Sequence, residues 1–295
     1  MALKLLWLQG LSCNGNAHSF FNVPDMAGVL REFAFIYHPL LPCEATLEEV
    51  SGGDFSPDVL IVEGALRRDG VPRGDEEALT LITRYAKQAK WVVCAGQCAV
   101  FGGIFRLNEP DKIAGALYAG QERGGFLDAF EKKIINLPGC PVHPEWLLFT
   151  LRMLALGTVP RLDDLRRPVE LYGYTVHEGC LRNEYFEWKV DAKDFGAKEG
   201  CLFYEQGCRG PYTRGSCNKI LWNGVNSKTR AGMPCIGCTE PDFPAERLFE
   251  TETLMSIPAR LPLEVPKRAY LTLTGMAKAF RIPRLTRRKF GEEEP

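Results

Sequence analysis

The sequence predicts an α/β fold, in which a doubly wound parallel sheet is followed by an irregular, cysteine-rich region. Two observations carry this prediction. Short apolar runs alternate with amphipathic helical segments up to about residue 160, which is typical of a parallel sheet with helices on both faces. Beyond that point the periodicity fades, and glycine, proline and cysteine become dense. We therefore predict two domains, residues 1–160 and 161–295, as suits a chain of 295 residues.

Four apolar runs are the predicted strands of the sheet. They span residues 5–8, 59–62, 91–93 and 134–135. Each run is continuous rather than alternating, as in parallel strands that are buried on both faces. Ligands of such sheets gather in the loops at the carboxyl ends of the strands. The residues that follow each run are therefore the first candidates for a functional site.

Two segments have the pattern of helices between these strands. Residues 75–90 carry Leu79, Ile82 and Tyr85 at helical spacing, with acidic residues in the first turn and lysines in the last, as the helix dipole favours. Residues 145–156 follow Pro144, a residue that favours the first position of a helix. Strands and helices thus alternate as a doubly wound sheet requires.

The composition and charge are those of an ordinary globular chain. Hydrophobic residues make up 45% and charged residues 25%, and 36 basic against 37 acidic side chains leave a net charge of -1. Disorder is excluded by this composition, and nothing favours nucleic acid as a partner. The opening MALKLLWLQG predicts a buried strand rather than an export signal, and no apolar stretch reaches the ~18 residues of a membrane span. We expect a cytoplasmic protein without a transmembrane segment, at most peripheral to a membrane.

The end of the chain carries a basic tail. Residues 278–289 interleave basic and apolar side chains, and Pro283 interrupts any long amphipathic helix there. We expect a solvated or partner-facing end.

Eleven cysteines are the unusual feature of the composition. Their number is odd, so a complete disulfide set is not expected, and in a reducing compartment such cysteines bind metal or perform redox chemistry. Cys13, Cys94, Cys98 and Cys140 all come shortly after predicted strands, so three loops should bring thiols to one edge of the sheet. Neighbouring glycines would let backbone amides approach a sulfur-rich anion. Scattered buried thiols are the alternative interpretation.

The second half of the chain carries two further ligand sets with more specific spacing. They are His177, Cys180, Cys201 and Cys208, and Cys217, Cys235 and Cys238. Soft thiolates suit iron-sulfur clusters and zinc alike. A zinc ribbon would pair one CxxC with another, or with HxxxH, and neither partner is present. The pattern therefore favours iron-sulfur clusters, with zinc and structural cysteines as alternatives.

Seven motifs together resemble the small, electron-transferring subunit of nickel-iron hydrogenases. In chain order they are LLWLQGLSCNGN, VEGAL, CAGQCAVFGGI, LPGCPVHPEW, VHEGC, CLFYEQGCRGP and WNGVNSKTRAGMPCIGCTEPDFP, and they extend from Leu5 to about Phe243. The resemblance implies a flavodoxin-like doubly wound parallel sheet followed by an irregular iron-sulfur cluster-binding domain. It also implies a separate large subunit that splits hydrogen, so no catalytic residue is expected in this chain.

The resemblance further implies three clusters in a row. Cys13, Cys98 and Cys140 would hold the proximal cluster. His177, Cys180, Cys201 and Cys208 would hold the distal 4Fe-4S cluster, and Cys217, Cys235 and Cys238 the medial 3Fe-4S cluster. Cys43 and Cys94 have no counterpart among the family's ligands and are expected to be structural.

The sequence departs from the family pattern around the proximal ligands. Asn16 stands where the fourth proximal ligand is usual, so the proximal cluster is expected to be 3Fe-4S or an atypical 4Fe-4S. Exchange of a thiolate for a neutral amide should raise its reduction potential. His18 stands in place of a glutamate and is expected to be a hydrogen-bonded neighbour, with ligation of the cluster as the alternative. Glu63, in VEGAL, would assist protons or cluster hydrogen bonding, with a buried structural carboxylate as the alternative.

Two departures concern the other clusters. The loop from Cys201 to Cys208 is one residue longer than is usual, and Ser227-Lys228 replaces the common Trp-Pro near the medial ligands. The geometry of the distal site and the surroundings of the medial site are therefore expected to differ from the family pattern.

In having Asn16 and in its predicted location, the chain resembles the cytoplasmic uptake branch of the family. We predict a subunit that passes electrons from H₂ oxidation to an acceptor such as a quinone or an electron carrier. Its partner would be the large nickel-iron subunit, in a dimer of heterodimers or a larger assembly. The small subunit of a hydrogen-sensing regulatory hydrogenase is the first alternative, and a complex I-like or deazaflavin-linked electron-transfer subunit is the second.

Overall fold

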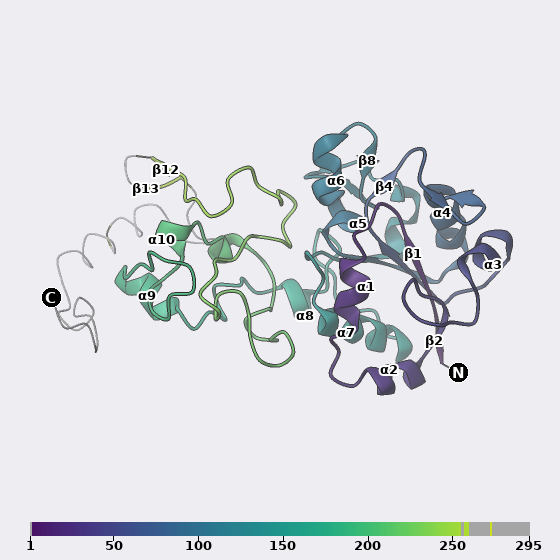
Figure 1. The fold of residues 1–295 in the computed structure, drawn as a ribbon, viewed down its shortest axis with the longest axis horizontal. Coiled ribbons are helices and arrows are strands. Elements are labelled where there is room, and N and C mark those ends of the chain that lie inside the picture. Colours follow the sequence, from purple (N-terminus) through teal and green to yellow (C-terminus); the bar gives the residue numbers. More distant parts are fainter. Residues whose placement is uncertain (1, 255–256, 260–271, 273–295) are drawn as a thin grey trace.

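The computed structural model describes residues 2–254, 257–259 and 272. Figure 1 shows an α/β part beside a part with few regular elements, joined near α8 (Val169–Tyr172). The predicted basic tail, residues 278–289, lies outside the described residues. The division into two domains at residue 160 remains a prediction.

The α/β part is built on a five-stranded parallel sheet. Its strands are β1 (Leu3–Gln9), β2 (Phe33–Tyr37), β3 (Val59–Glu63), β7 (Trp91–Ala95) and β11 (Ile134–Leu137). They lie in the order β11-β7-β3-β1-β2, which is the flavodoxin-like order with its switch point between β1 and β3. All four predicted strands are confirmed, and the predicted fold class with them. The prediction did not include β2.

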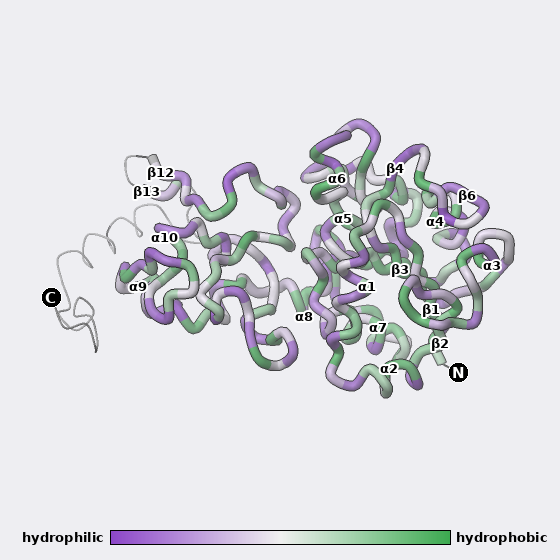
Figure 2. The backbone as a smooth tube through the Cα atoms, in the orientation of Figure 1, coloured by the Kyte–Doolittle hydropathy of each residue, from purple (hydrophilic) through white to green (hydrophobic). Residues whose placement is uncertain are grey.

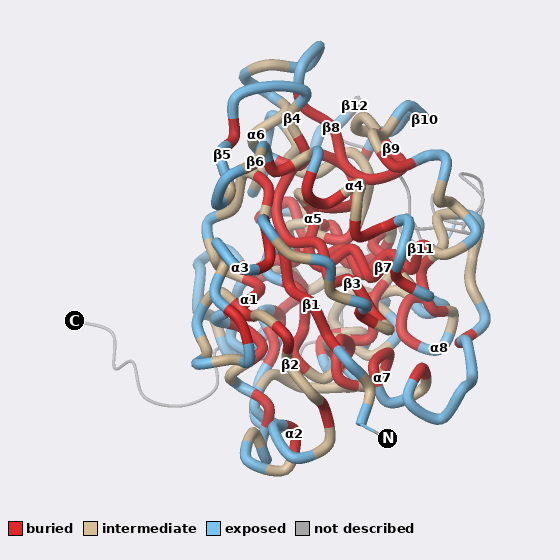
Figure 3. The backbone as a smooth tube through the Cα atoms, turned by 90° about the vertical axis from the view of Figure 1, so that its right-hand side faces the viewer, coloured by how far each residue is buried: buried red, intermediate tan, exposed pale blue. Residues whose placement is uncertain are grey.

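Helices cover both faces of the sheet. On one face lie α1 (Gly15–Phe20), α2 (Met26–Glu32) and α7 (Pro144–Ala155), and on the other α3 (Leu47–Gly52), α4 (Ala78–Gln88) and α5 (Gln97–Phe101). Successive strand residues point to opposite faces, so Leu6 and Leu8 enter one apolar core while Leu5 and Trp7 enter the other. Figure 2 shows hydrophobic residues along the central strands, and Figure 3 shows the same strands buried inside the helices.

One predicted helix begins later than its sequence pattern suggests. The predicted segment 75–90 is helical only in α4, because β6 (Glu76–Glu77) pairs with β5 (Pro72–Arg73) just before it. The predicted helix 145–156 is α7, in which Pro144 takes the first turn and the His143 side chain accepts a hydrogen bond from the Glu145 N–H.

Short elements complete the described structure. They are β4 (Leu66–Arg67), α6 (Gly103–Asn108), β8 (Ile113–Ala114), β9 (Tyr118–Ala119), β10 (Glu122–Arg123), η1 (Asp128–Lys133), α9 (Asn183–Trp188), α10 (Phe203–Gln206), η2 (Gly210–Tyr212), β12 (Thr253–Leu254) and β13 (Ile257–Pro258). Those after residue 180 are all brief, so loops make up most of the irregular part. Among the described residues, none of the helices has the length and apolar character to cross a membrane.

Candidate metal centres

The first set of thiols lies at the carboxyl edge of the sheet. Cys13 follows β1, Cys98 lies in α5 directly after β7, and Cys140 follows β11. Burial raises the pKa of Cys98 to about 12, and the thiolates of Cys140 and Cys13 add to the rise, so the three sulfurs are electrostatic neighbours. The topology therefore brings together the three predicted proximal ligands, although their role as ligands remains a prediction.

This proximal site is open at the surface of the chain. Cys13 and Cys140 are exposed, and Cys98 is partly buried. A group held by these thiols would have one side embedded in the sheet edge and the other available to a second protein.

Asn16 is part of a buried hydrogen-bond network beside this site. Its Oδ1 accepts from the Val142 N–H at 2.9 Å, and its Nδ2 donates to Glu63 Oε1 at 3.3 Å. Gly96 makes room for this amide, because a Cβ there would lie 2.4 Å from Asn16 Oδ1, and its φ of 92° also favours glycine. The amide therefore joins three loops of the sheet edge, and its oxygen is already bound to a backbone donor.

Glu63 ends β3 as a fully buried carboxylate. Oε2 accepts from Trp7 Nε1 and Gln9 Nε2, both at 2.9 Å. Oε1 accepts from the Asn16 side chain and from the backbone N–H groups of Asn16 and Ala17. Such saturation with donors compensates the burial of the charge. These hydrogen bonds give Glu63 a structural role at the sheet edge, and its role toward protons or the cluster remains a prediction.

His18 lies exposed on α1. Within the described residues, its side chain takes no part in the hydrogen bonds of Asn16 and Glu63.

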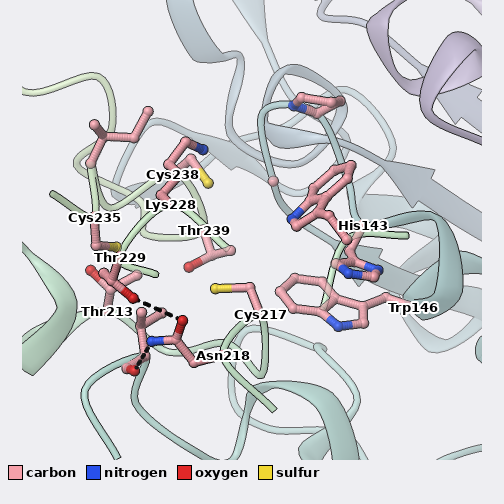
Figure 4. A pocket seen from close by; sticks show the side chains of 15 residues that line it. His143, Trp146, Thr213, Cys217, Asn218, Lys228, Thr229, Cys235, Cys238 and Thr239 are labelled. Atoms are coloured by element: carbon pink, nitrogen blue, oxygen red, sulfur yellow. Dashed lines mark hydrogen bonds between the residues drawn. The ribbon is translucent and has the colours of Figure 1, made fainter. Parts of the chain in front are cut away.

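The second set of thiols lines one cavity in the irregular part. Cys217, Cys235 and Cys238 all face it, together with His143 and Trp146 from the loop after β11 and from α7 (Figure 4). Burial, followed by the thiolates of Cys235 and Cys238, raises the pKa of Cys217. Burial also raises the pKa of Cys235, followed by the distal thiolate of Cys208 and then by that of Cys238. The cavity thus combines the three predicted medial ligands with a wall from the α/β part.

The third set lines a separate cavity deeper in the irregular part. All four predicted distal ligands contribute to it: His177, Cys180, Cys201 and Cys208. Backbone N–H groups already point at two of the sulfurs, from Arg182 to Cys180 Sγ and from Phe203 to Cys201 Sγ, each at 3.4 Å. Amide hydrogen bonds to sulfur are among the interactions that tune an iron-sulfur cluster.

The longer loop between Cys201 and Cys208 keeps both thiols at this cavity. It forms the single turn α10, and Gly207 ends the turn with a φ of 64°. Burial, more than any neighbouring charge, raises the pKa of Cys201 and of Cys208 to about 12.

The three sites form a continuous series. Desolvation, followed by the thiolates of Cys238 and Cys13, raises the pKa of Cys140, so the medial and proximal thiols influence one another. The Cys235 N–H donates to Cys208 Sγ at 3.3 Å, which connects the medial loop directly to a distal thiol. The order along the molecule is therefore proximal, medial, distal.

The donors fit iron-sulfur clusters in chemistry and in placement. Within the described residues, no three His, Cys, Asp or Glu side chains form a group that could hold a metal ion. The thiols instead surround cavities, as the separate irons of a cluster require.

Comparison with known proteins agrees with this arrangement. Residues 172–250 match the family model for the C-terminal region of NiFe/NiFeSe hydrogenase small subunits, and residues 13–154 match "NADH ubiquinone oxidoreductase, 20 Kd subunit". The uptake hydrogenase small subunit of Azotobacter vinelandii is 31% identical over 274 residues, which cover 86% of this chain and 74% of the relative. The chain belongs to the family of nickel-iron hydrogenase small subunits.

Two more relatives support the assignment of this small subunit. The quinone-reactive Ni/Fe-hydrogenase small chain of Wolinella succinogenes is 29% identical over 266 residues, covering 82% of this chain and 71% of the relative. A [NiFeSe] hydrogenase structure from Desulfovibrio vulgaris Hildenborough superposes with a TM-score of 0.70 and 27% identity, covering 85% of this chain and 98% of that one. Members of this family form hydrogenase complexes with a large subunit.

The structure also places residues at the sites that sequence reasoning did not assign. Arg182 is buried beside the distal cavity and donates to the carbonyls of Gly200 and Thr229, each at 2.8 Å, and of Ala197. His143 packs against the Trp146 and Trp222 rings at the medial cavity. The one sequence feature that could have identified these residues is their position. Arg182 lies two residues after Cys180, and His143 lies three residues after Cys140 in this small subunit.

Proposed function

We propose that this chain carries electrons in an uptake hydrogenase. They would come from H₂ oxidation in the large subunit, pass through three iron-sulfur clusters, and leave to an acceptor such as a quinone. The observation that carries the proposal is the unbroken series of three thiol sets, from the exposed sheet edge to the interior of the irregular part.

Each set has a defined task in this proposal. Iron-sulfur clusters supply the chemistry, since they accept and release one electron at a time. The proximal thiols hold a cluster at the face open to the large subunit. The medial thiols, Cys217, Cys235 and Cys238, hold a 3Fe-4S cluster, and the distal set with His177 holds a 4Fe-4S cluster. The protein excludes water around the inner two, because Cys201, Cys208 and Cys235 are buried.

The proximal cluster is proposed to have three thiolate ligands, as a 3Fe-4S or an atypical 4Fe-4S cluster. The Asn16 amide oxygen is engaged by the Val142 N–H, and this supports a bracing role rather than ligation. Loss of one thiolate charge raises the reduction potential, which suits oxidation of H₂ with a high-potential acceptor.

The uptake direction and the quinone acceptor are supported by relatives. One relative is named an uptake hydrogenase small subunit, and another is named quinone-reactive. We further propose a cytoplasmic location, at most peripheral to a membrane, and a dimer of heterodimers or a larger assembly. The location rests on the expectation that a chain with so many cysteines works in a reducing compartment, although some relatives are named periplasmic.

The test is H₂-dependent dye reduction by the native complex copurified with this chain, combined with nickel and iron analysis. Rapid turnover with both metals present is expected. Slow turnover in a complex with a histidine kinase would favour the hydrogen-sensing alternative. No turnover and no nickel would overturn the hydrogenase assignment for this complex. Washed membranes with and without added quinone then test the acceptor.

A further inference from the structure

Lys228 stands out among the residues that line the medial cavity. It shares this cavity with Cys217 and Cys238, and Figure 4 shows it in the same group of side chains. No other aspartate, glutamate, lysine or arginine is among the described residues that line the cavity. The one histidine there, His143, is neutral near pH 7 because burial lowers its pKa to about 4. The lysine therefore supplies the fixed charge of the cavity wall, apart from the thiols themselves.

The backbone at Lys228 is held firmly relative to a medial thiol. Its neighbours Ser227 and Thr229 are buried, and both hydroxyls donate to Asn218 Oδ1. Asn218 directly follows Cys217 in the chain. The Lys228 carbonyl in turn accepts from the Met233 N–H at 2.9 Å. Although its side chain is exposed, the lysine thus starts from a fixed point beside Cys217.

The medial cavity also reaches the loop that carries a proximal thiol. Gly139 and Pro141, the two neighbours of Cys140 in the chain, line it together with Lys228. The lysine therefore lies where the proximal and medial sites meet.

We propose that Lys228 sets the potential of the medial cluster by placing a positive charge at the proximal-medial junction. Reduction adds one negative charge to a cluster, and a nearby cation stabilises that reduced state. The electron moves from the proximal to the medial cluster, and no bond or proton need move with it. Lys228 thereby favours electron flow away from the large subunit. The inference rests on the proposed function, since it requires clusters at both sites.

The test is an EPR-monitored redox titration of the medial 3Fe-4S signal in the purified complex. Lys228→Met removes the charge, and its medial potential is expected to fall below that of the wild type. Lys228→Arg keeps the charge and should retain most of the wild-type potential. Lys90→Met is the matched control, because Lys90 is an exposed lysine just before β7, at the opposite edge of the sheet from the thiols.

The outcomes separate this inference from the proposed function. Equal potentials in Lys228→Met and the wild type, with the EPR signals intact, would overturn the role of Lys228 and leave the proposed function standing. An equal fall in Lys228→Met and Lys228→Arg would overturn it too, since packing rather than charge would then be responsible. A wild-type complex without iron-sulfur signals would overturn both.

Discussion

The proximal site and the inner two sites are built in different ways. The proximal thiols project from the edge of a parallel sheet that has two apolar cores of its own, and Cys13 and Cys140 are exposed. In the irregular part, Cys201, Cys208 and Cys235 are each 7% exposed and are themselves members of the third, smaller core. The α/β part can therefore fold by apolar packing, whereas the irregular part has only this smaller core and depends more on the groups that its thiols hold.

The stability of the inner region should therefore depend on its iron-sulfur clusters more than that of the α/β part does. Free buried thiols keep their protons, as the raised pKa values of about 12 for Cys201 and Cys208 indicate. Iron must displace those protons, so cluster binding and folding of the inner region are coupled. At the proximal edge, hydrogen bonds of Glu63 and Asn16 also hold the loops, so this region depends less on the group that its thiols hold.

Loss of a distal ligand should produce the largest effect. Cys208→Ala in the purified complex is expected to abolish the distal EPR signal and to expose residues 176–238 to hydrogen exchange, while β3 and α7 stay protected. Structural metals contribute on the order of 10 kcal/mol to folding of small domains, which sets the scale of the local loss. Exchange mass spectrometry measures both regions in one sample.

Cys43→Ser is the matched control, because Cys43 is a partly buried cysteine outside all three thiol sets. Equal loss of protection in both parts of Cys208→Ala would contradict the comparison.

Glu63→Gln tests the hydrogen-bonded edge directly. The glutamine side chain has an NH₂ group in place of one carboxylate oxygen. This donor then faces the N–H group of Trp7 or of Asn16, so the hydrogen bond made there is lost. Hydrogen bonds to charged groups contribute about 1.5–3 kcal/mol each, so the local opening free energy of α1 should fall by about 3 kcal/mol. Native-state exchange of α1 amides measures this fall.

The distal EPR signal should remain unchanged in Glu63→Gln. Its loss would show that the two regions are not independent. Glu122→Gln, at an exposed glutamate of β10, serves as the control for loss of one acidic charge.

Arg182→Lys probes the inner region without removing a ligand. A lysine retains the charge but cannot reach the carbonyls of Ala197, Gly200 and Thr229 together, because it lacks the guanidinium fork. We expect a local loss of about 2 kcal/mol and a broadened distal EPR signal. Arg230→Lys, at an exposed arginine, should leave the signal unchanged. An unaltered EPR signal in Arg182→Lys would show that the hydrogen bonds of Arg182 to the three carbonyls do not shape the distal site.

Four strands of the sheet were predictable from the sequence, whereas β2 was not, and the difference has a physical reason. Continuous apolar runs identified β1, β3, β7 and β11, because buried parallel strands need such runs. The run FAFIY of β2 is equally apolar, but β2 starts directly after α2 with no loop between them, so no turn residue marks its start. Strand β6 depends on pairing with β5, which no local pattern announces.

The candidate sites show the same limit. Spacing grouped the thiols of the irregular part as the structure does. Strand ends also included Cys94 in the first set, although Cys94 lies buried inside β7. The bracing of Asn16 was not predictable, because its oxygen meets a backbone N–H that lies 126 residues away. The family pattern did place Ser227-Lys228 near the medial ligands, but the hydrogen bonds from Ser227 and Thr229 to Asn218 were not predictable from the sequence.

The smallest expected effect is an acid sensitivity of the α/β part that does not involve the clusters. His38 is 2% exposed among the rings of Trp7, Phe20 and Phe35, and burial lowers its pKa from 6.5 to about 4. Because the unfolded chain binds this proton more readily, the stabilising contribution is complete above pH 6.5 and falls as the pH drops toward 4. Between pH 6.5 and 5.5 the loss is about 1.4 kcal/mol at most.

His38→Asn should flatten this pH dependence, because asparagine does not titrate. Its amide oxygen can still accept the hydrogen bond that the Leu40 N–H now donates to His38 Nδ1. The readout is exchange protection of β1 and β2 between pH 5.5 and 7, corrected for the intrinsic exchange rate. His18→Asn, at an exposed histidine, is the control. If the wild type and His38→Asn lose protection of β1 equally on acidification, the acid sensitivity originates elsewhere. The irregular part of the wild type could also lose as much exchange protection on acidification as β1 does, and His38→Asn could abolish both losses. That result would show instead that the sheet and the cluster region unfold as one unit.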